Sequence, residues 1–450
     1  MAEPADPIAR LRARLAPDGR FLRAVAVYGV GQFGLKALDL LAFALLVRAL
    51  TPAEFGFVGA VALLGFMVTD VAPLGLFRVA APRFAAEGGD VRRCALDAAL
   101  AGYLAYAPAM AVLVALTPAT ALAAVGLGGF ALALKIYLLS YLMRAFAYQE
   151  LEILRMDHRP IAQALLEAVP SLLNVLLLLL LLPRAADKVL ASAVCAALAW
   201  SPLFLGFLAF ALRARRPRLA GLVDLLRYSG PMTVHRSLSE LNNLAGRWVV
   251  LLTAGLAGAG AYTFFARLGD LLKLAQAPLL KAWIPAALAA ERDNTPERAR
   301  AAAKLVLAAG LALFLAALAL CRPLARLVDA NGAFADVYDA IPVVLFAGWV
   351  LNFYYVFAAG YFVDRRPAAL APITALAAGT NLGLTLLLVR AEGVLAAPWA
   401  AVAANLLFTL TSAWFGRRRL RFADRSVGRT AVLCALVGLA AFVADRVWHG

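Results

Sequence analysis

Charged residues are scarce in this sequence of 450 residues. Asp, Glu, Lys and Arg together make up 16% of it, whereas hydrophobic residues make up 64%. An ordinary globular chain is about half apolar and about a quarter charged. A water-soluble fold has no means of hiding so much apolar surface, so the composition excludes a soluble globular protein.

Cysteine clusters and catalytic signatures are missing as well. The four cysteines show neither CxxC spacing nor a neighbouring His, so we expect no disulfide, no metal site and no cofactor. The absence of a Walker A motif, a dinucleotide fingerprint and a catalytic triad pattern argues against an enzyme. The first 23 residues are polar and rich in Arg, and a full-length apolar run follows them, which argues against a cleavable signal peptide.

Long apolar runs recur along the whole chain. About 20 apolar residues suffice to cross the hydrocarbon core, and a helix pairs all its backbone groups internally. The sequence therefore predicts an all-α membrane protein with about twelve transmembrane helices, in two parallel six-helix lobes around a central cavity. Numbered in chain order, the spans are 24–48, 57–79, 94–116, 121–143, 161–182, 189–212, 229–253, 262–284, 303–321, 338–362, 368–389 and 394–415. A run at 431–444 is short for a span and is either a thirteenth helix or an interfacial one.

The distribution of basic residues predicts the orientation. With a cytoplasmic N-terminal segment, the loops on the outside contain only six of the 43 Lys and Arg residues. These six are Arg48, Arg184, Lys188, Arg322, Arg326 and Arg390. Because basic loops alternate through all twelve spans, the net charge of +16 reflects the positive-inside rule rather than nucleic-acid binding.

The two halves of the chain repeat at an offset near 205 residues. The sequence DHRP at 157–160 precedes span five, DRRP at 364–367 precedes span eleven, and Asn174 then aligns with Asn381. Because six spans per copy is an even number, both copies share one orientation, as in transporters built from parallel repeats. We expect a cytoplasmic segment at 1–23, an N-lobe at 24–216, a C-lobe at 217–430 and an apolar tail at 431–450.

Polar stripes run along spans one, seven and eight. Their members are Gln32, Lys36 and Asp39 in span one, Arg236, Glu240, Asn243 and Arg247 in span seven, and Arg267, Asp270 and Lys281 in span eight. Each set falls on one helix face, and the first three members of span seven follow those of span one by 204 residues. Ionisable groups at membrane depth are costly and usually line a pathway. These ten residues are the candidate substrate-binding residues, around a cleft between the lobes.

A structural alternative is that these charges pair internally, as Lys36 with Asp39 or Arg236 with Glu240. With Lys273, spans seven and eight together contain five cations and two acids. The positive excess favours an anionic substrate over a cationic one.

Two segments resemble signatures of the Wzx-type polysaccharide flippases, in the multidrug/oligosaccharidyl-lipid/polysaccharide exporter (MOP) superfamily. VRALTPAEFG at 47–56 is similar to the family's R-x-L-x-P-x-E-[FY]-G. The segment 231–268, which ends in GRWVVLLTAGLAGAGAYTFFARL, is similar to the start of its second lobe. Gly246 stands where the family commonly has an Asp, so the resemblance assigns no coupling-ion role there. Pro398 and Trp399 also interrupt the family's small-residue start of span twelve.

The resemblance implies a flippase that moves an undecaprenyl-pyrophosphate-linked oligosaccharide across the bacterial inner membrane by alternating access. Its implied partners are the lipid-linked substrate, the membrane, a coupling ion (proton or sodium) and polysaccharide assembly proteins. The alternatives are a drug or metabolite exporter of the same fold, which calls for an acidic cavity, and a membrane polysaccharide polymerase or ligase. A polymerase or ligase requires a large catalytic loop on the outside, and the longest outside loop runs only from about 322 to 337.

Overall fold

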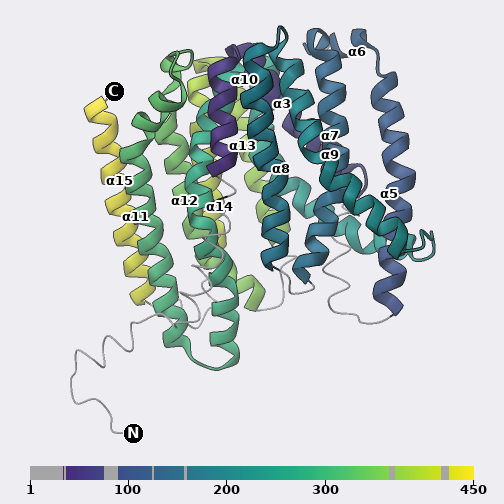
Figure 1. Ribbon diagram of the computed structural model, residues 1–450. Coiled ribbons are helices and arrows are strands. Elements are labelled where there is room, and N and C mark those ends of the chain that lie inside the picture. Colours follow the sequence, from purple (N-terminus) through teal and green to yellow (C-terminus); the bar gives the residue numbers. More distant parts are fainter. Residues whose placement is uncertain are drawn as a thin grey trace. The chain divides into compact units, whose positions relative to one another are not determined.

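The computed structural model describes residues 34, 37–74, 90–123, 126–156, 160–363, 370–416 and 425–449, in which every regular element is a helix (Figure 1). Residues 37–49 are helical. The longer elements after them are α3 (Pro52–Phe66), which continues into the π-helix η1 (Met67–Val71), α5 (Asp90–Leu116), α7 (Ala131–Met156), α8 (Pro160–Leu181), α9 (Lys188–Ala214), α10 (Leu222–Arg292), α11 (Pro296–Val328), α12 (Ala340–Val363), α13 (Leu370–Glu392), α14 (Ala397–Gly416) and α15 (Arg425–His449). Short connections are α6 (Ala119–Ala123), η2 (Gly128–Phe130), η3 (Leu182–Arg184), η4 (Ala335–Val337) and η6 (Val394–Ala396).

The predicted fold class is confirmed. Among the described residues, 11 helices are long and apolar enough to cross a membrane. They include spans two to six and nine to twelve, while spans seven and eight are joined in α10. Residues 37–49 belong to span one, whose first part lies outside the described residues.

The apolar run at 431–444 lies inside a helix long enough to span. α15 extends beyond the run at both ends, and its segment Arg425–Trp448 has 24 residues. At its last turns, Asp445 forms an ion pair with Arg322 of α11, with 2.9 Å between Oδ1 and Nη1. Arg446 donates a hydrogen bond to the backbone carbonyl of Asp339 at 2.9 Å. The apolar run ends before Asp445, but the helix continues. Asp445 and Arg446 can extend it because both have partners elsewhere in the chain.

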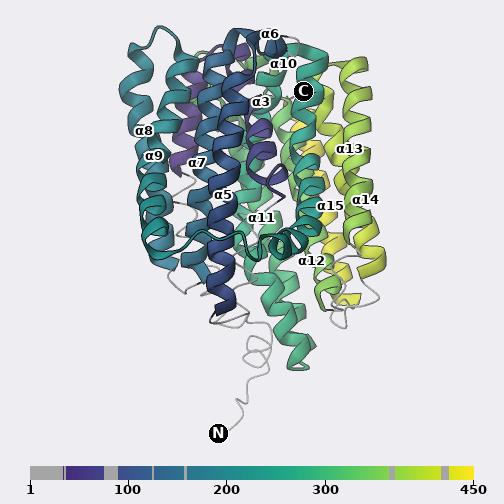
Figure 2. The ribbon, with the colours of Figure 1, turned by 90° about the vertical axis from the view of Figure 1, so that its right-hand side faces the viewer.

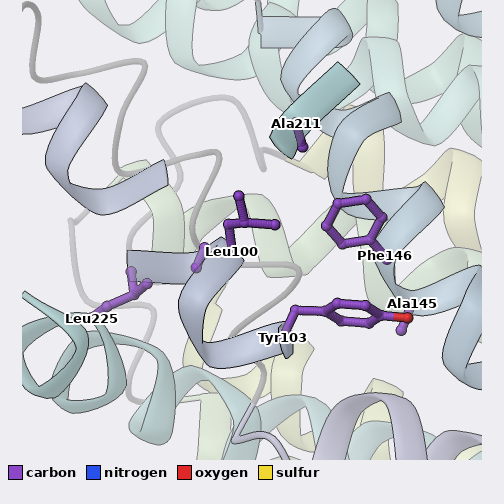
Figure 3. Packing of buried hydrophobic residues seen from close by; sticks show 7 residues of the cluster. Leu100, Tyr103, Ala145, Phe146, Ala211 and Leu225 are labelled. Atoms are coloured by element: carbon purple, nitrogen blue, oxygen red, sulfur yellow. The ribbon is translucent and has the colours of Figure 1, made fainter. Parts of the chain in front are cut away.

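The chain divides into two compact units, Leu35–Thr263 and Phe264–Gly450. In the first unit, α7 packs against α3, α5, α8 and α9. Figure 3 shows one core cluster, in which Tyr103 and Phe146 face each other with ring centres 4.6 Å apart, near Leu100 and Leu225. Phe146 also meets Phe204 edge to face at 6.0 Å. Tyr103 and Phe204 are also 6.2 Å apart, so the three rings pack α5, α7 and α9 together.

In the second unit, α14 packs between α12 and α13, and α11 contacts both α12 and α15 (Figures 1 and 2). The core is aromatic: Trp349 stacks on Phe314 with ring centres 4.9 Å apart, and Phe346 stacks on Phe442 at 4.5 Å. A Cβ at Gly438 would overlap the Trp349 ring, so this glycine admits the indole against α15. The repeat boundary expected at 216/217 stays a prediction.

Candidate functional site

The helical hairpin α10 contains most of the predicted site residues. Gly255, with φ 70° and ψ −171°, interrupts it, so that α10 has a first arm at 222–254 and a second arm from 256 to 292. Glycine adopts this conformation without the steric cost that a Cβ brings. Ala259 packs with Leu251 of the first arm, and a Cβ at Gly246 would overlap the Tyr262 hydroxyl. The arms therefore fold back on each other at the tip.

The two signature segments contact each other at this tip. Thr51 caps α3: its hydroxyl accepts a hydrogen bond from the Glu54 N–H, and the Glu54 carboxylate accepts one from the Thr51 N–H at 2.8 Å. A Cβ at Gly56 would overlap the Leu256 carbonyl oxygen, and one at Gly260 would overlap the Pro52 carbonyl oxygen. Thr51, Glu54, Gly56 and Gly260 of these segments thus serve a helix cap and a close backbone approach.

The first arm contains four of the predicted residues, Arg236, Glu240, Asn243 and Arg247. All four lie on continuous helix, and Arg247 is buried while Glu240 is half-buried. The side chains of Arg236 and Asn243 lie outside the described part of the structure, as does that of Lys281 in the second arm. Their roles stay predictions.

On the second arm, Asp270 and Lys273 form an ion pair. The Lys273 Nζ lies 3.1 Å from the Asp270 Oδ1, and the side chains are 38% and 34% exposed. Arg267 is exposed one turn earlier. The spacing i, i+3 places two helical residues side by side, so this pair could have been predicted from the sequence. The sequence analysis instead grouped Asp270 with Arg267 and Lys281.

In the first unit, Arg144 of α7 lies one residue beyond predicted span four but inside the candidate span Gly128–Leu154, and the sequence analysis did not select it. Its guanidinium carbon lies 5.1, 5.7 and 5.0 Å from the ring centres of Tyr141, Tyr148 and Trp200. Cations over aromatic faces are stabilised by the ring quadrupole. The exposed Asp39 of span one lies within electrostatic range of Arg144. Gln32 and Lys36 lie outside the described residues.

A cavity of about 310 Å³ lies between the second arm of α10 and α12. Lys273, Gln276 and Leu280 line it from α10, and Gly348, Leu351 and Tyr355 line it from α12. The Trp283 indole donates a hydrogen bond to the Tyr355 carbonyl at 3.2 Å and joins the same two helices nearer their C-terminal ends. The sequence analysis missed Gln276 and Tyr355, because a single polar residue on an apolar face gives no periodic signal.

The fold is shared with transporters of known structure. An inward-facing multidrug resistance MATE family transporter of the MOP superfamily superposes with a TM-score of 0.71 at 16% identity, covering 88% of this chain and 98% of that one. The MATE multidrug transporter DinF-BH gives 0.66 at 16% identity, with 91% and 97% covered. A MOP superfamily transporter from Pyrococcus furiosus, described as having a binding pocket of reverse polarity that suggests a different function, gives 0.60 at 15%, with 92% and 98% covered.

No protein-family model matches the sequence, and no curated protein matches it. At such low identities the structural likeness establishes the fold alone. This chain therefore has the fold of the MATE transporters of the MOP superfamily. The narrower Wzx-type resemblance remains a matter for proposal.

Proposed function

We propose that this chain is a flippase, and not an enzyme, which moves an undecaprenyl-pyrophosphate-linked oligosaccharide from the inner to the outer leaflet of a bacterial inner membrane. The fold supports a transporter, but a fold does not fix its substrate. The substrate class rests on the charge of the site, and the lipid carrier rests on the resemblance of the two signature segments.

The excess of cations in α10 carries the proposal. Its two predicted spans contain five cations and two acids. One of the acids, Asp270, is already in an ion pair with Lys273. A cleft lined in this way attracts an anionic headgroup, which cannot cross hydrocarbon unaided, while the lipid tail remains in the bilayer. An inside-negative potential favours outward movement of an anion by about 2.3 kcal/mol per charge per 100 mV.

A second candidate is a drug exporter, favoured by the multidrug transporters that share the fold. Such an exporter would recognise organic cations, for which an acidic cavity is the physical requirement. The two candidates differ in the sign of the charge that they carry, which makes them separable in one assay.

Reconstituted vesicles test the proposal. The purified chain is placed in liposomes with a polyprenyl pyrophosphate that bears a radiolabelled sugar in the inner leaflet, and the label exposed to an external glycosidase is followed over time. We expect exposure well above that of protein-free vesicles, and faster exposure with a potential negative inside.

The matched control replaces the lipid with a cationic rhodamine dye, trapped inside the same vesicles. Release of the dye without exposure of the sugar would assign the chain to drug export instead. A proton or sodium gradient, imposed in either assay, identifies the coupling ion by the acceleration it causes.

A further inference from the structure

The segment that joins α9 to α10 is anchored to the first unit at both ends. Ala211 of α9 and Leu225 of α10 are buried in the same core cluster as Leu100 of α5 (Figure 3). Between these two anchors, the Cys94 thiol of α5 donates a hydrogen bond to the Ala220 carbonyl, with 3.7 Å between the sulfur and the oxygen. The joining segment therefore lies against the start of α5.

Two acids of the first unit face the inner side of this segment. The Glu150 carboxylate of α7 accepts two hydrogen bonds from the Arg215 guanidinium, both at 2.6 Å, and both side chains are buried. The buried Asp97 carboxylate of α5 accepts a hydrogen bond from the Arg216 N–H at 3.1 Å. Both carboxylates are therefore engaged by inward-facing groups of the segment, and not by the guanidinium of Arg216.

The outer side of the segment is a basic patch. Its exposed members are Arg93, which precedes Cys94, and Arg213, Arg216, Arg218 and Arg227. Among the described residues, no acid forms an ion pair with the first four. The Arg227 guanidinium lies 3.9 Å from the Asp224 carboxylate, but both side chains are largely exposed, so the interaction is weak and screened by salt. The patch therefore presents an excess of positive charge.

Apolar side chains are exposed among these cations. Leu212, Leu219 and Val223 are 48%, 65% and 61% exposed. The segment also lies at the edge of the membrane by the predicted spans, since span six ends at 212 and span seven begins at 229 on the predicted cytoplasmic side. Exposed cations beside exposed aliphatic groups are typical of surfaces that lie at the boundary of headgroups and acyl chains.

From these observations we infer that residues 212–227, together with Arg93, form a binding surface for anionic phospholipids of the membrane. Each guanidinium offers several N–H donors to the phosphate oxygens, and the aliphatic side chains contact the acyl chains. A zwitterionic headgroup contains a cation of its own, so the positive excess favours an anionic lipid. The inference goes beyond the flippase proposal and does not depend on it, because it concerns the lipids around the protein and not the transported molecule.

Quenching by brominated lipids tests the surface in the full chain. A bimane fluorophore is attached at Val223→Cys, in a background with Cys94→Ser and with the three buried cysteines changed to alanine. The vesicles contain phosphatidylglycerol and phosphatidylcholine in equal amounts, and the acyl chains of only one of them are brominated. We expect brominated phosphatidylglycerol to quench at least about threefold more strongly, because each Lys or Arg near an anionic surface raises affinity by about fivefold.

Variants separate the outer arginines from the inner one. Changing Arg213, Arg216 and Arg218 together to Gln should reduce the quenching ratio to less than about 1.5, whereas changing them to Lys keeps the charge and should keep the preference. Arg215→Gln is the matched control. It should lower the thermal unfolding midpoint, because it leaves the buried Glu150 without its ion-pair partner, but it should keep the lipid preference.

Two further controls concern salt and location. Raising the salt from about 0.1 M to about 1 M should lower the ratio for the unaltered arginines, since the Debye length falls from about 10 Å to about 3 Å. A fluorophore at Leu113, which is 60% exposed near the other end of α5, should be quenched equally by the two lipids.

Three results would overturn the inference. The first is equal quenching by the two lipids at Val223→Cys in low salt. The second is a preference that neither the triple change to Gln nor high salt reduces, and the salt series decides if the triple variant does not reach the membrane. The third is loss of the preference when a small fraction of polyprenyl pyrophosphate is added, which would assign the surface to the transported lipid instead of the phospholipids.

Discussion

At the scale of single residues, the charged side chains of the membrane helices differ in their contacts. Some are held by another residue of the chain, and others are exposed. Asp270 forms an ion pair with Lys273, and Arg144 lies among three aromatic rings. Arg267 is exposed on the second arm of α10. We therefore expect charge pairing at Asp270 and Lys273 and substrate attraction at Arg267, on different residues of the same helix.

Substitutions on the second arm separate these two roles. Arg267→Ala should abolish transport at near-normal abundance in the membrane, and Arg267→Lys should keep part of it, because positive charge attracts the headgroup. Lys273→Ala should lower stability by no more than about 1 kcal/mol, since the pair is about one third exposed. Transport by vesicles and abundance by immunoblot are measured together.

The double change Asp270→Ala with Arg267→Ala tests whether Arg267 acts by pairing with Asp270. If it restores both transport and abundance to an Arg267→Ala protein, then Arg267 acts by pairing with Asp270 and not on the substrate. The double change Asp270→Ala with Lys273→Ala is the matched control, and should recover the stability that Lys273→Ala alone removes.

At the scale of elements, glycines set how closely helices approach. Gly56 of α3 and Gly260 of the second arm lie where a Cβ would meet a backbone carbonyl of the other helix. A backbone carbonyl has no rotamer by which to move aside, unlike the end of a flexible side chain. The α3–α10 contact therefore depends on having no side chain at either position.

Alanine at these glycines should loosen that contact. Gly56→Ala and Gly260→Ala should each destabilise the protein by about 1–3 kcal/mol, the usual cost of overpacking. Gly206→Ala in α9 is the control, because Gly206 is a helical glycine with nothing within 4 Å, and it should stabilise by about 0.5–1 kcal/mol. Thermal unfolding in detergent measures all three. Equal midpoints for the three variants would contradict a tight contact.

At the scale of the whole molecule, the contacts of the polar end of α15 predict how many times the chain crosses the membrane. Arg322 follows the predicted outside end of span nine, and it contacts both Asp445 and Asp339, at 2.9 and 3.2 Å. In the predicted topology α15 begins after the cytoplasmic end of span twelve, and the contact with Arg322 places its last turns on the predicted outside. We therefore expect α15 to be a thirteenth span.

Reporter fusions test that topology. A reporter at Arg218 should read cytoplasmic, and reporters near Ala333 and after His449 should both read outside. An interfacial α15 would instead place the fusion after His449 in the cytoplasm. Cysteines substituted at Arg322 and Asp445, in a background without the four native cysteines, should form a crosslink that survives denaturation, whereas cysteines at Arg322 and Arg425 should not.

The sequence by itself determined the properties that hydropathy and chain order encode: the all-helical membrane fold, nearly every span, and the helix faces that contain Asp39, Glu240 and Asp270. These are local properties, because a span must be about 20 apolar residues long whatever surrounds it. Only the tertiary structure decided which side chains meet. The cavity beside Gln276, the contact of Arg144 with Trp200 and the Arg322–Asp445 pair join residues far apart in the chain, up to 123 positions for the last, at distances set by helix packing that no periodicity encodes.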